Sequence, residues 1–214
     1  MLLKIFFLLL VLAVANVSYK GRTFNGTSWN RVIALSLWFI VCSLVLLGTN
    51  YQKLLVTFNF TTVGIFIITT LVWFLFPKLI RFYGTYPSSY LKDKKGNTRF
   101  MVRFELPSMT IKYFEVLFQQ VTFLFLLFVV LVGLPKMTGI FLFTLIVAII
   151  HLGNLFFMNK KWALLYFVLS IPMAILFGYM IMRGFILLTA SIHLAFYLIF
   201  NAHYWFASNN KKSH

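Results

Sequence analysis

Long runs of apolar residues, separated by short polar intervals, dominate the pattern of this chain. Each run approaches or exceeds the roughly 20 residues that an α-helix needs to cross the hydrocarbon core of a bilayer. We therefore expect an all-α fold, a polytopic transmembrane helix bundle of about seven spans. The runs cover about residues 1–17, 31–49, 54–76, 113–133, 137–158, 162–182 and 185–207.

One polar interval is much longer than the others and divides the chain. It covers residues 77–112, begins with Pro77-Lys78 and carries Lys92-Asp93-Lys94-Lys95-Gly96-Asn97. The division predicts three N-terminal transmembrane helices in 1–76, a basic cytoplasmic loop in 77–112, and a four-helix core with a short tail in 113–214. At the end of the loop, Leu106–Tyr113 is expected to form an interfacial turn, with Ser108 or Thr110 as an N-cap.

Composition supports a membrane protein and argues against a nucleic-acid partner. The chain is 62% hydrophobic and 10% charged, whereas a soluble domain is about half apolar and a quarter charged. A net charge of +16 is typical of nucleic-acid binding, but these basic residues fall between the apolar runs. The lipid bilayer is therefore the first expected partner. The single cysteine, Cys42, excludes an intramolecular disulfide framework.

The distribution of basic residues predicts the orientation in the membrane. Placing the 77–112 loop in the cytoplasm puts 15 of the 19 lysines and arginines inside and leaves Lys4, Lys53, Lys136 and Arg183 outside. The opposite orientation violates the positive-inside bias at nearly every loop. We therefore expect a cytoplasmic C-terminus and, with seven spans, an N-terminus outside.

The first apolar run has a second interpretation. Its charged start, apolar stretch and Ala13-Val14-Ala15 also resemble a secretory signal with a small-residue cleavage site. A retained first helix is the favoured interpretation, and a cleaved signal is the alternative.

Glu115 is the only carboxylate in the apolar part of the chain, because Asp93 and Glu105 lie in the polar loop. An ionisable group within a membrane-length apolar segment costs about 2.5–3.5 kcal/mol at the centre and less near an end. Such a residue usually faces a polar interior. Glu115 is therefore the first functional-site candidate.

The last four runs carry further polar side chains that are costly in lipid. On the expected orientation most of them occupy the cytoplasmic half of the membrane, where they would line one wet cavity with His193 as its floor. Glu115 and Gln119 are spaced i,i+4 on one helical stripe, and His193, Tyr197 and Asn201 form another. The whole set is Glu115, Gln119, Gln120, His151, Asn154, His193, Asn201 and His203.

A carboxylate with two imidazoles is compatible with several kinds of site. Glu115 would serve as a general base while His151 and His193 stabilise an oxyanion. The same three residues would also suit a His-His-Glu metal site, and the two histidines a haem or quinone pocket. Their depths differ by about 8 Å, which disfavours a bis-histidine haem, and no cofactor is the favoured interpretation.

Each of these residues also has a purely structural interpretation. Glu115 would reach out to Lys112 and the lipid headgroups. His151 and His193 would form interhelical hydrogen bonds without chemistry. His203, beside Tyr204 and Trp205, would belong to an interfacial aromatic belt.

The order and spacing of these residues resemble the CAAX protease and bacteriocin-processing family of intramembrane peptidases, also called the Abi family. That family reads Glu-Glu-x-x-x-Arg, then Phe-x-x-x-His, then a Gly-rich helix leading through Arg-Thr-Gly to His-x-x-x-Asn. The resemblance covers roughly residues 105–205. Its matching segments are Phe114-Glu115-Val116-Leu117-Phe118-Gln119-Gln120, Val147–Leu152, Gly178–Gly184 and Ser191–Tyr197.

Several motif positions differ from the family pattern. Phe114 stands where the family has the first glutamate, which the family is thought to use as general base. Gln119 stands for the arginine, Val147 for the phenylalanine and Tyr197 for the asparagine. The second glutamate, Glu115, and both histidines remain.

The resemblance implies two functions in a bacterial cytoplasmic membrane. In the first, an intramembrane peptidase, Glu115 and His151 activate water and His193 stabilises the oxyanion on a membrane-proximal peptide substrate. Supporting residues would be Gln119, Gln120, Tyr197 and Asn201. In the second, an inactive pseudo-peptidase holds a partner membrane protein as a scaffold, assembly or immunity subunit. A haem- or quinone-binding anchor is a third and minor alternative.

Overall fold

The computed structural model describes residues 2–17, 28–48, 60–83, 106–156 and 160–209. Within these ranges, the side chains of residues 16, 17, 76–83, 108, 162, 200, 201 and 203–209 are not described. The described part of the chain is helical and contains no strand. Its elements are α1 (Leu2–Val17), α2 (Trp29–Leu47), α3 (Phe60–Tyr83), α4 (Leu106–Phe125), a π-helical turn (Leu126–Val130), α5 (Lys136–Leu152), a 3₁₀ turn (Gly153–Phe156), α6 (Lys160–Met182) and α7 (Ile186–Asn209).

Each apolar run of the sequence contains a helix, but the polar interval between α3 and α4 is shorter than expected. α3 continues to Tyr83, and α4 begins at Leu106. The turn expected at Leu106–Tyr113 is therefore wrong, since the segment is helical. Pro107 is tolerated because peptide N–H groups in the first turn have no intrahelical partner. Thr110 is no N-cap; its hydroxyl donates to the Leu106 carbonyl at 2.8 Å.

Four helical stretches in the described part of the chain are long and apolar enough to cross a membrane. They are Trp29–Leu47, Met109–Val130, Lys136–Phe156 and Ala163–Met182. The remaining helices contribute shorter described apolar stretches, Leu2–Ala15, Phe60–Leu75 and Ile186–Ile199. By length and composition the chain is thus a helical protein with four candidate membrane spans.

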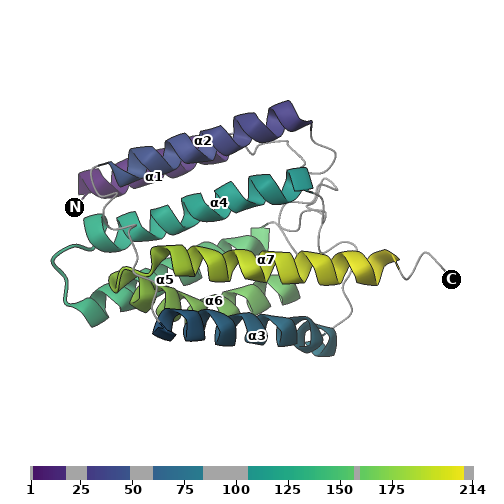
Figure 1. Ribbon diagram of the computed structural model, residues 1–214. Coiled ribbons are helices and arrows are strands. Elements are labelled where there is room, and N and C mark those ends of the chain that lie inside the picture. The colour runs from purple at the N-terminus through teal and green to yellow at the C-terminus, as the bar shows by residue number, and fades with distance from the viewer. Residues whose placement is uncertain (1, 18–27, 49–59, 84–105, 157–159, 210–214) are drawn as a thin grey trace.

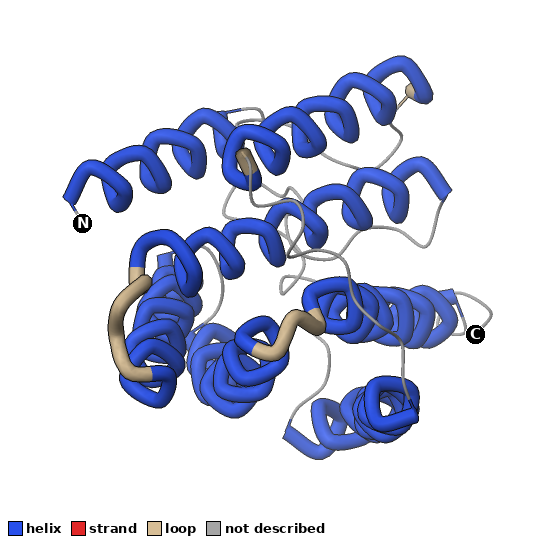
Figure 2. The backbone as a smooth tube through the Cα atoms, turned by 60° about the vertical axis from the view of Figure 1, so that its left-hand side comes forward, coloured by secondary structure: helices blue, strands red, loops and turns tan. Residues whose placement is uncertain are grey.

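α4 lies in the middle of the bundle (Figure 1). α2 packs on one side of it and α1 packs on α2, while α7 packs on the other side with α5 and α6 nearby. α3 contacts the outer side of α7, which places it at the edge furthest from α1 (Figure 2). Consistent with its central position, α4 buries Ile111, Val116 and Leu124 completely.

α1 is part of the packed bundle. Leu8, Val11 and Ala15 are buried, and the ring of Phe7 lies 5.8 Å from that of Phe125 at the end of α4. The small-residue motif that suggested a cleavage site thus includes Ala15, a packed side chain. Removal of this segment would expose apolar surface on α2.

A tight turn at Gly184 joins α6 to α7. Gly184 adopts a φ of 85°, a left-handed conformation that residues with a Cβ rarely adopt. Its N–H donates to Ile181 O at 2.9 Å, and the Phe185 N–H donates to Met180 O at 3.0 Å. This pair of bonds is a Schellman motif, which satisfies carbonyls at the end of a helix. The turn brings α7 back antiparallel to α6 and sets the register of its polar residues.

α5 and α6 pack closely because α6 carries a glycine at their contact. A Cβ built at Gly178 would lie 3.0 Å from Phe143 Cδ1 and 3.4 Å from Ile140 Cγ2. Small residues permit this kind of close approach between helices in membranes, where dispersion rather than water exclusion drives association.

We expect Gly178→Val to destabilise the bundle, because the added atoms collide with Phe143 and overpacking costs about 1–3 kcal/mol. Gly64→Val is the matched control, since a Cβ at Gly64 meets nothing within 4 Å. Thermal unfolding in detergent measures both variants. Equal melting temperatures for the two would contradict the close α5–α6 contact.

Candidate functional site

Three polar side chains on one face of α4 form a hydrogen-bonded group. Lys112 Nζ donates to Glu115 Oε2 at 2.8 Å, and Gln119 Nε2 donates to Glu115 Oε1 at 3.0 Å. The spacings are i,i+3 and i,i+4, which place side chains on neighbouring turns of one helical face. Both carboxylate oxygens of Glu115 are therefore already engaged within α4.

Lys112 is the residue of this site that sequence reasoning underestimated. The structural interpretation of Glu115 paired it with Lys112 near the lipid headgroups; the pair is present, but only 2% of the Lys112 side chain is exposed, against 13% for Glu115. Its ammonium lies 4.4 Å from the ring centroid of Tyr197 on α7. A cation over an aromatic face is stabilised by the ring quadrupole, more strongly where water is excluded. In the sequence, the only indication that Lys112 belongs to this site was its i,i+3 spacing to Glu115.

A second contact joins α4 to α7 next to the first. Gln120 Nε2 lies 3.0 Å from His193 Nδ1. An amide nitrogen can only donate, so in this orientation His193 accepts at Nδ1 and a neutral ring carries its proton on Nε2. The His193 ring stacks on Tyr197, with centroids 5.2 Å apart and an interplanar angle of 29°. Tyr197 therefore lies between the lysine and the histidine.

α3 supports this part of α7 from the outside. Trp73 Nε1 donates to the Ile192 carbonyl at 3.1 Å, and the Trp73 ring meets that of Phe196 edge-on at 4.9 Å. Trp73 thus contacts α7 at the residue before His193 and at the residue three positions after it. Sequence reasoning assigned α3 no such role, because nothing in its apolar pattern distinguishes Trp73.

His151 is placed differently from the other candidates. Its Nδ1 lies 2.8 Å from the Val147 carbonyl of its own helix, a distance at which a protonated nitrogen donates. His151 is half-buried on α5. Asn154 follows in the 3₁₀ turn. The side chains of Asn201 and His203 lie outside the described residues.

The metal alternative finds no support in the described residues. No three His, Cys, Asp or Glu side chains in this part of the chain lie close enough together to hold a metal ion. Glu115, His151 and His193 are all among the residues searched.

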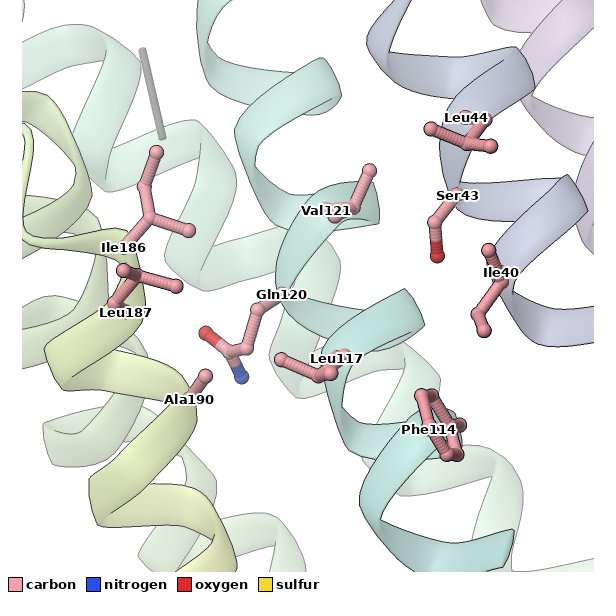
Figure 3. A pocket seen from close by; sticks show the side chains of 10 residues that line it. All are labelled: Ile40, Ser43, Leu44, Phe114, Leu117, Gln120, Val121, Ile186, Leu187 and Ala190. Carbon is pink, nitrogen blue, oxygen red and sulfur yellow. The ribbon is translucent and has the colours of Figure 1, made fainter. Parts of the chain in front are cut away.

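A cleft of about 230 Å³ lies where α2, α4 and α7 meet, next to the polar cluster (Figure 3). Phe114 lines it at the position where the resemblance expects the first glutamate. Gln120 lines the cleft and also contacts His193, and its Oε1 is buried without a hydrogen-bond partner among the described residues. The full lining is Ile40, Ser43, Leu44, Phe114, Leu117, Gln120, Val121, Ile186, Leu187 and Ala190.

These contacts limit the chemistry of Glu115. A general base needs a free lone pair within hydrogen-bond reach of the water that it activates. Here the Lys112 ammonium donates to one carboxylate oxygen and the Gln119 amide donates to the other. Among the described residues, the site is a hydrogen-bonded polar network that joins α4 to α7, in which Gln120 Oε1 has no hydrogen-bond partner.

Comparison with models of known protein families, with curated proteins and with solved structures finds no match to this chain.

We expect Lys112→Met to destabilise the protein by about 3–5 kcal/mol, because removing one partner of a buried ion pair leaves an uncompensated charge. The double variant Lys112→Met/Glu115→Gln removes both charges and should recover most of this loss. Chemical or thermal unfolding in detergent measures the free energy of unfolding of the parent protein, of Lys112→Met, of Glu115→Gln and of the double variant.

Lys160→Met is the control for loss of a single positive charge, since Lys160 is exposed at the start of α6. Its unfolding free energy should stay within about 0.5 kcal/mol of the parent protein. A double variant as unstable as the sum of its two single variants would contradict a coupled pair.

Proposed function

We propose that this protein is a membrane-embedded scaffold that holds a partner membrane protein and does not hydrolyse it. The main support is the engagement of Glu115. Both of its oxygens accept hydrogen bonds, from Lys112 Nζ at 2.8 Å and from Gln119 Nε2 at 3.0 Å. This matches the pseudo-peptidase implied by the family resemblance, in which the helix framework persists without the hydrolytic pair.

The proposed seat of the partner is the cleft between α2, α4 and α7. Its lining is apolar apart from Ser43 and Gln120, and the Ser43 hydroxyl donates to Phe39 O within its own helix at 2.7 Å. A surface of this kind suits the apolar side chains of a transmembrane segment. Phe114 contributes packing at the position where an active family member would carry a carboxylate.

The membrane arrangement proposed with this function has seven spans, because α1, α3 and α7 carry shorter apolar stretches beside the four longer candidates. The basic 77–112 interval lies in the cytoplasm, the C-terminus lies on the same side and the N-terminus lies outside. The membrane is a bacterial cytoplasmic membrane, as the family resemblance implies.

A second candidate function is intramembrane proteolysis at the same place. It is favoured by the meeting of α4 and α7, which brings Gln120, His193 and Tyr197 together beside Lys112 and Glu115. In this form the neutral His193 ring presents its Nε2 proton to an oxyanion. Catalysis would require a substrate to displace Lys112 from Glu115.

We expect a photo-crosslinking amino acid at Leu117, in the cleft, to form an adduct of one discrete size with a membrane protein that co-purifies stoichiometrically. The same probe at Phe141, which is exposed on α5 and outside the cleft, is the matched control. Leu117→Trp should abolish co-purification by filling the cleft, while Phe141→Trp, outside the cleft, should leave it intact. Equal capture from both positions would contradict the cleft as the seat.

We expect the captured partner to stay uncut when it is incubated with the purified protein in proteoliposomes. Gel electrophoresis and mass spectrometry of the partner provide the measurement. Fragments that appear with the parent protein but disappear in Glu115→Gln and His193→Ala, at equal protein levels, would replace the scaffold by the peptidase.

A further inference from the structure

Two cations converge on one aromatic ring at the end of the bundle where α4 connects to α5 and α6 turns into α7 (Figure 1). Lys136 Nζ lies 5.4 Å from the ring centroid of Tyr179, and Arg183 Cζ lies 4.7 Å from the same centroid. Lys136 opens α5, whereas Tyr179 and Arg183 belong to the last turns of α6 and to the residue after it. The cluster therefore depends on the tertiary contact between α5 and α6.

No carboxylate in the described part of the chain neutralises these two charges. Glu115 is the only acidic residue there, and it is paired with Lys112. The Tyr179 ring attracts each cation, by about 0.5–1 kcal/mol at an exposed site, but it carries no net charge. Two like charges held beside one ring repel each other, and an anion between them would remove that repulsion.

The start of α5 adds hydrogen-bond donors at the same place. Its N-cap is Pro135, which makes no side-chain capping bond. The N–H groups of the first turn of any helix lack intrahelical acceptors and carry a partial positive charge. Lys136 therefore lies at the end of the helix dipole that disfavours a cation, and a bound anion would offset this cost.

Apolar side chains continue from the cluster along both helices. On α6, Ile175 precedes Tyr179 by one turn on the same face and is 49% exposed. On α5, Phe141 is 66% exposed, and Met137 one turn before it is also exposed. A ligand at this end would thus meet positive charge first and an apolar surface immediately beside it. An amphiphile with an anionic head fits both parts.

We propose that Lys136, Tyr179 and Arg183 form a binding site for the phosphate of an anionic phospholipid. The arginine fork and the lysine ammonium contact phosphate oxygens, and the first N–H groups of α5 complete the donor set. The acyl chains lie along the exposed residues of α5 and α6. This site is separate from the cleft and independent of the scaffold function.

Native mass spectrometry of the full chain in detergent, titrated with one lipid at a time, tests the proposal. The probes are phosphatidylglycerol, zwitterionic phosphatidylcholine, diacylglycerol and inorganic phosphate. The variant is Lys136→Gln/Arg183→Gln. Its matched control is Lys160→Gln/Lys161→Gln, which removes the same charge from the start of α6, at that helix's other end.

We expect the parent protein to retain phosphatidylglycerol in preference to the other three probes. The Lys136→Gln/Arg183→Gln variant should lose about ten- to thirtyfold in affinity, because each basic residue near a lipid surface contributes roughly a fivefold factor. The control pair should bind like the parent. Tyr179→Leu should also weaken binding, since the cations lose the ring that gathers them.

Three results would overturn the proposal. Equal retention of phosphatidylglycerol and phosphatidylcholine would remove the anionic preference. An equal loss in the Lys160→Gln/Lys161→Gln control would show a general charge effect. Binding of inorganic phosphate that matches the lipid would assign the site to free anions. If the double variant does not fold, the single variant Lys136→Gln replaces it in the same titration. Lys136 is exposed and is the first residue of α5, so this substitution should not disturb folding.

Discussion

The burial of a lysine and a glutamate inside an apolar bundle is the constraint around which the polar part of this protein is organised. A charge removed from water is costly unless an opposite charge and further hydrogen bonds accompany it. Lys112 and Glu115 meet this requirement on one helix, with Gln119 on the second carboxylate oxygen and the Tyr197 ring beneath the ammonium. Because Tyr197 belongs to α7, the pair also fixes how α7 faces α4. The contact between Lys112 and Tyr197 thereby also places His193 of α7 opposite Gln120 of α4.

The same network is the observation on which the proposed scaffold function rests. In this bundle Glu115 and His193 have partners already, and the cleft beside them is lined by Phe114 and aliphatic side chains. The polar side chains thus join α4 to α7, and the proposed binding surface is the apolar cleft next to them. Gln120, with one buried unpaired oxygen, lies between the two.

Sequence reasoning identified the helices and most of the relevant polar residues. It was weakest at the ends of the helices and at the contact partners of individual side chains. Apolar runs of membrane length locate helices well because an unpaired backbone is not tolerated in lipid. The start of α4 was misplaced by several residues, since the polar and proline-containing segment Leu106–Lys112 has no apolar run to mark it. Lys112 was counted with the basic loop, and its burial was not foreseen, because spacing shows which side chains share a helical face but not whether that face is buried.

The sequence by itself determined that this chain is helical and apolar enough for a bilayer, and that its ionisable groups in lipid are few. Those properties are local, because they follow from composition and from the period of a single helix. Only the tertiary structure decided that Lys112 is buried against the Tyr197 ring and that Gln120 reaches His193. It also decided that Lys136 and Arg183 both contact the Tyr179 ring. Three of these contacts, Lys112 with Tyr197, Gln120 with His193 and Lys136 with Tyr179, join residues on different helices. Their formation depends on helix rotation and register, which close-packed neighbours such as Gly178 and Phe143 set.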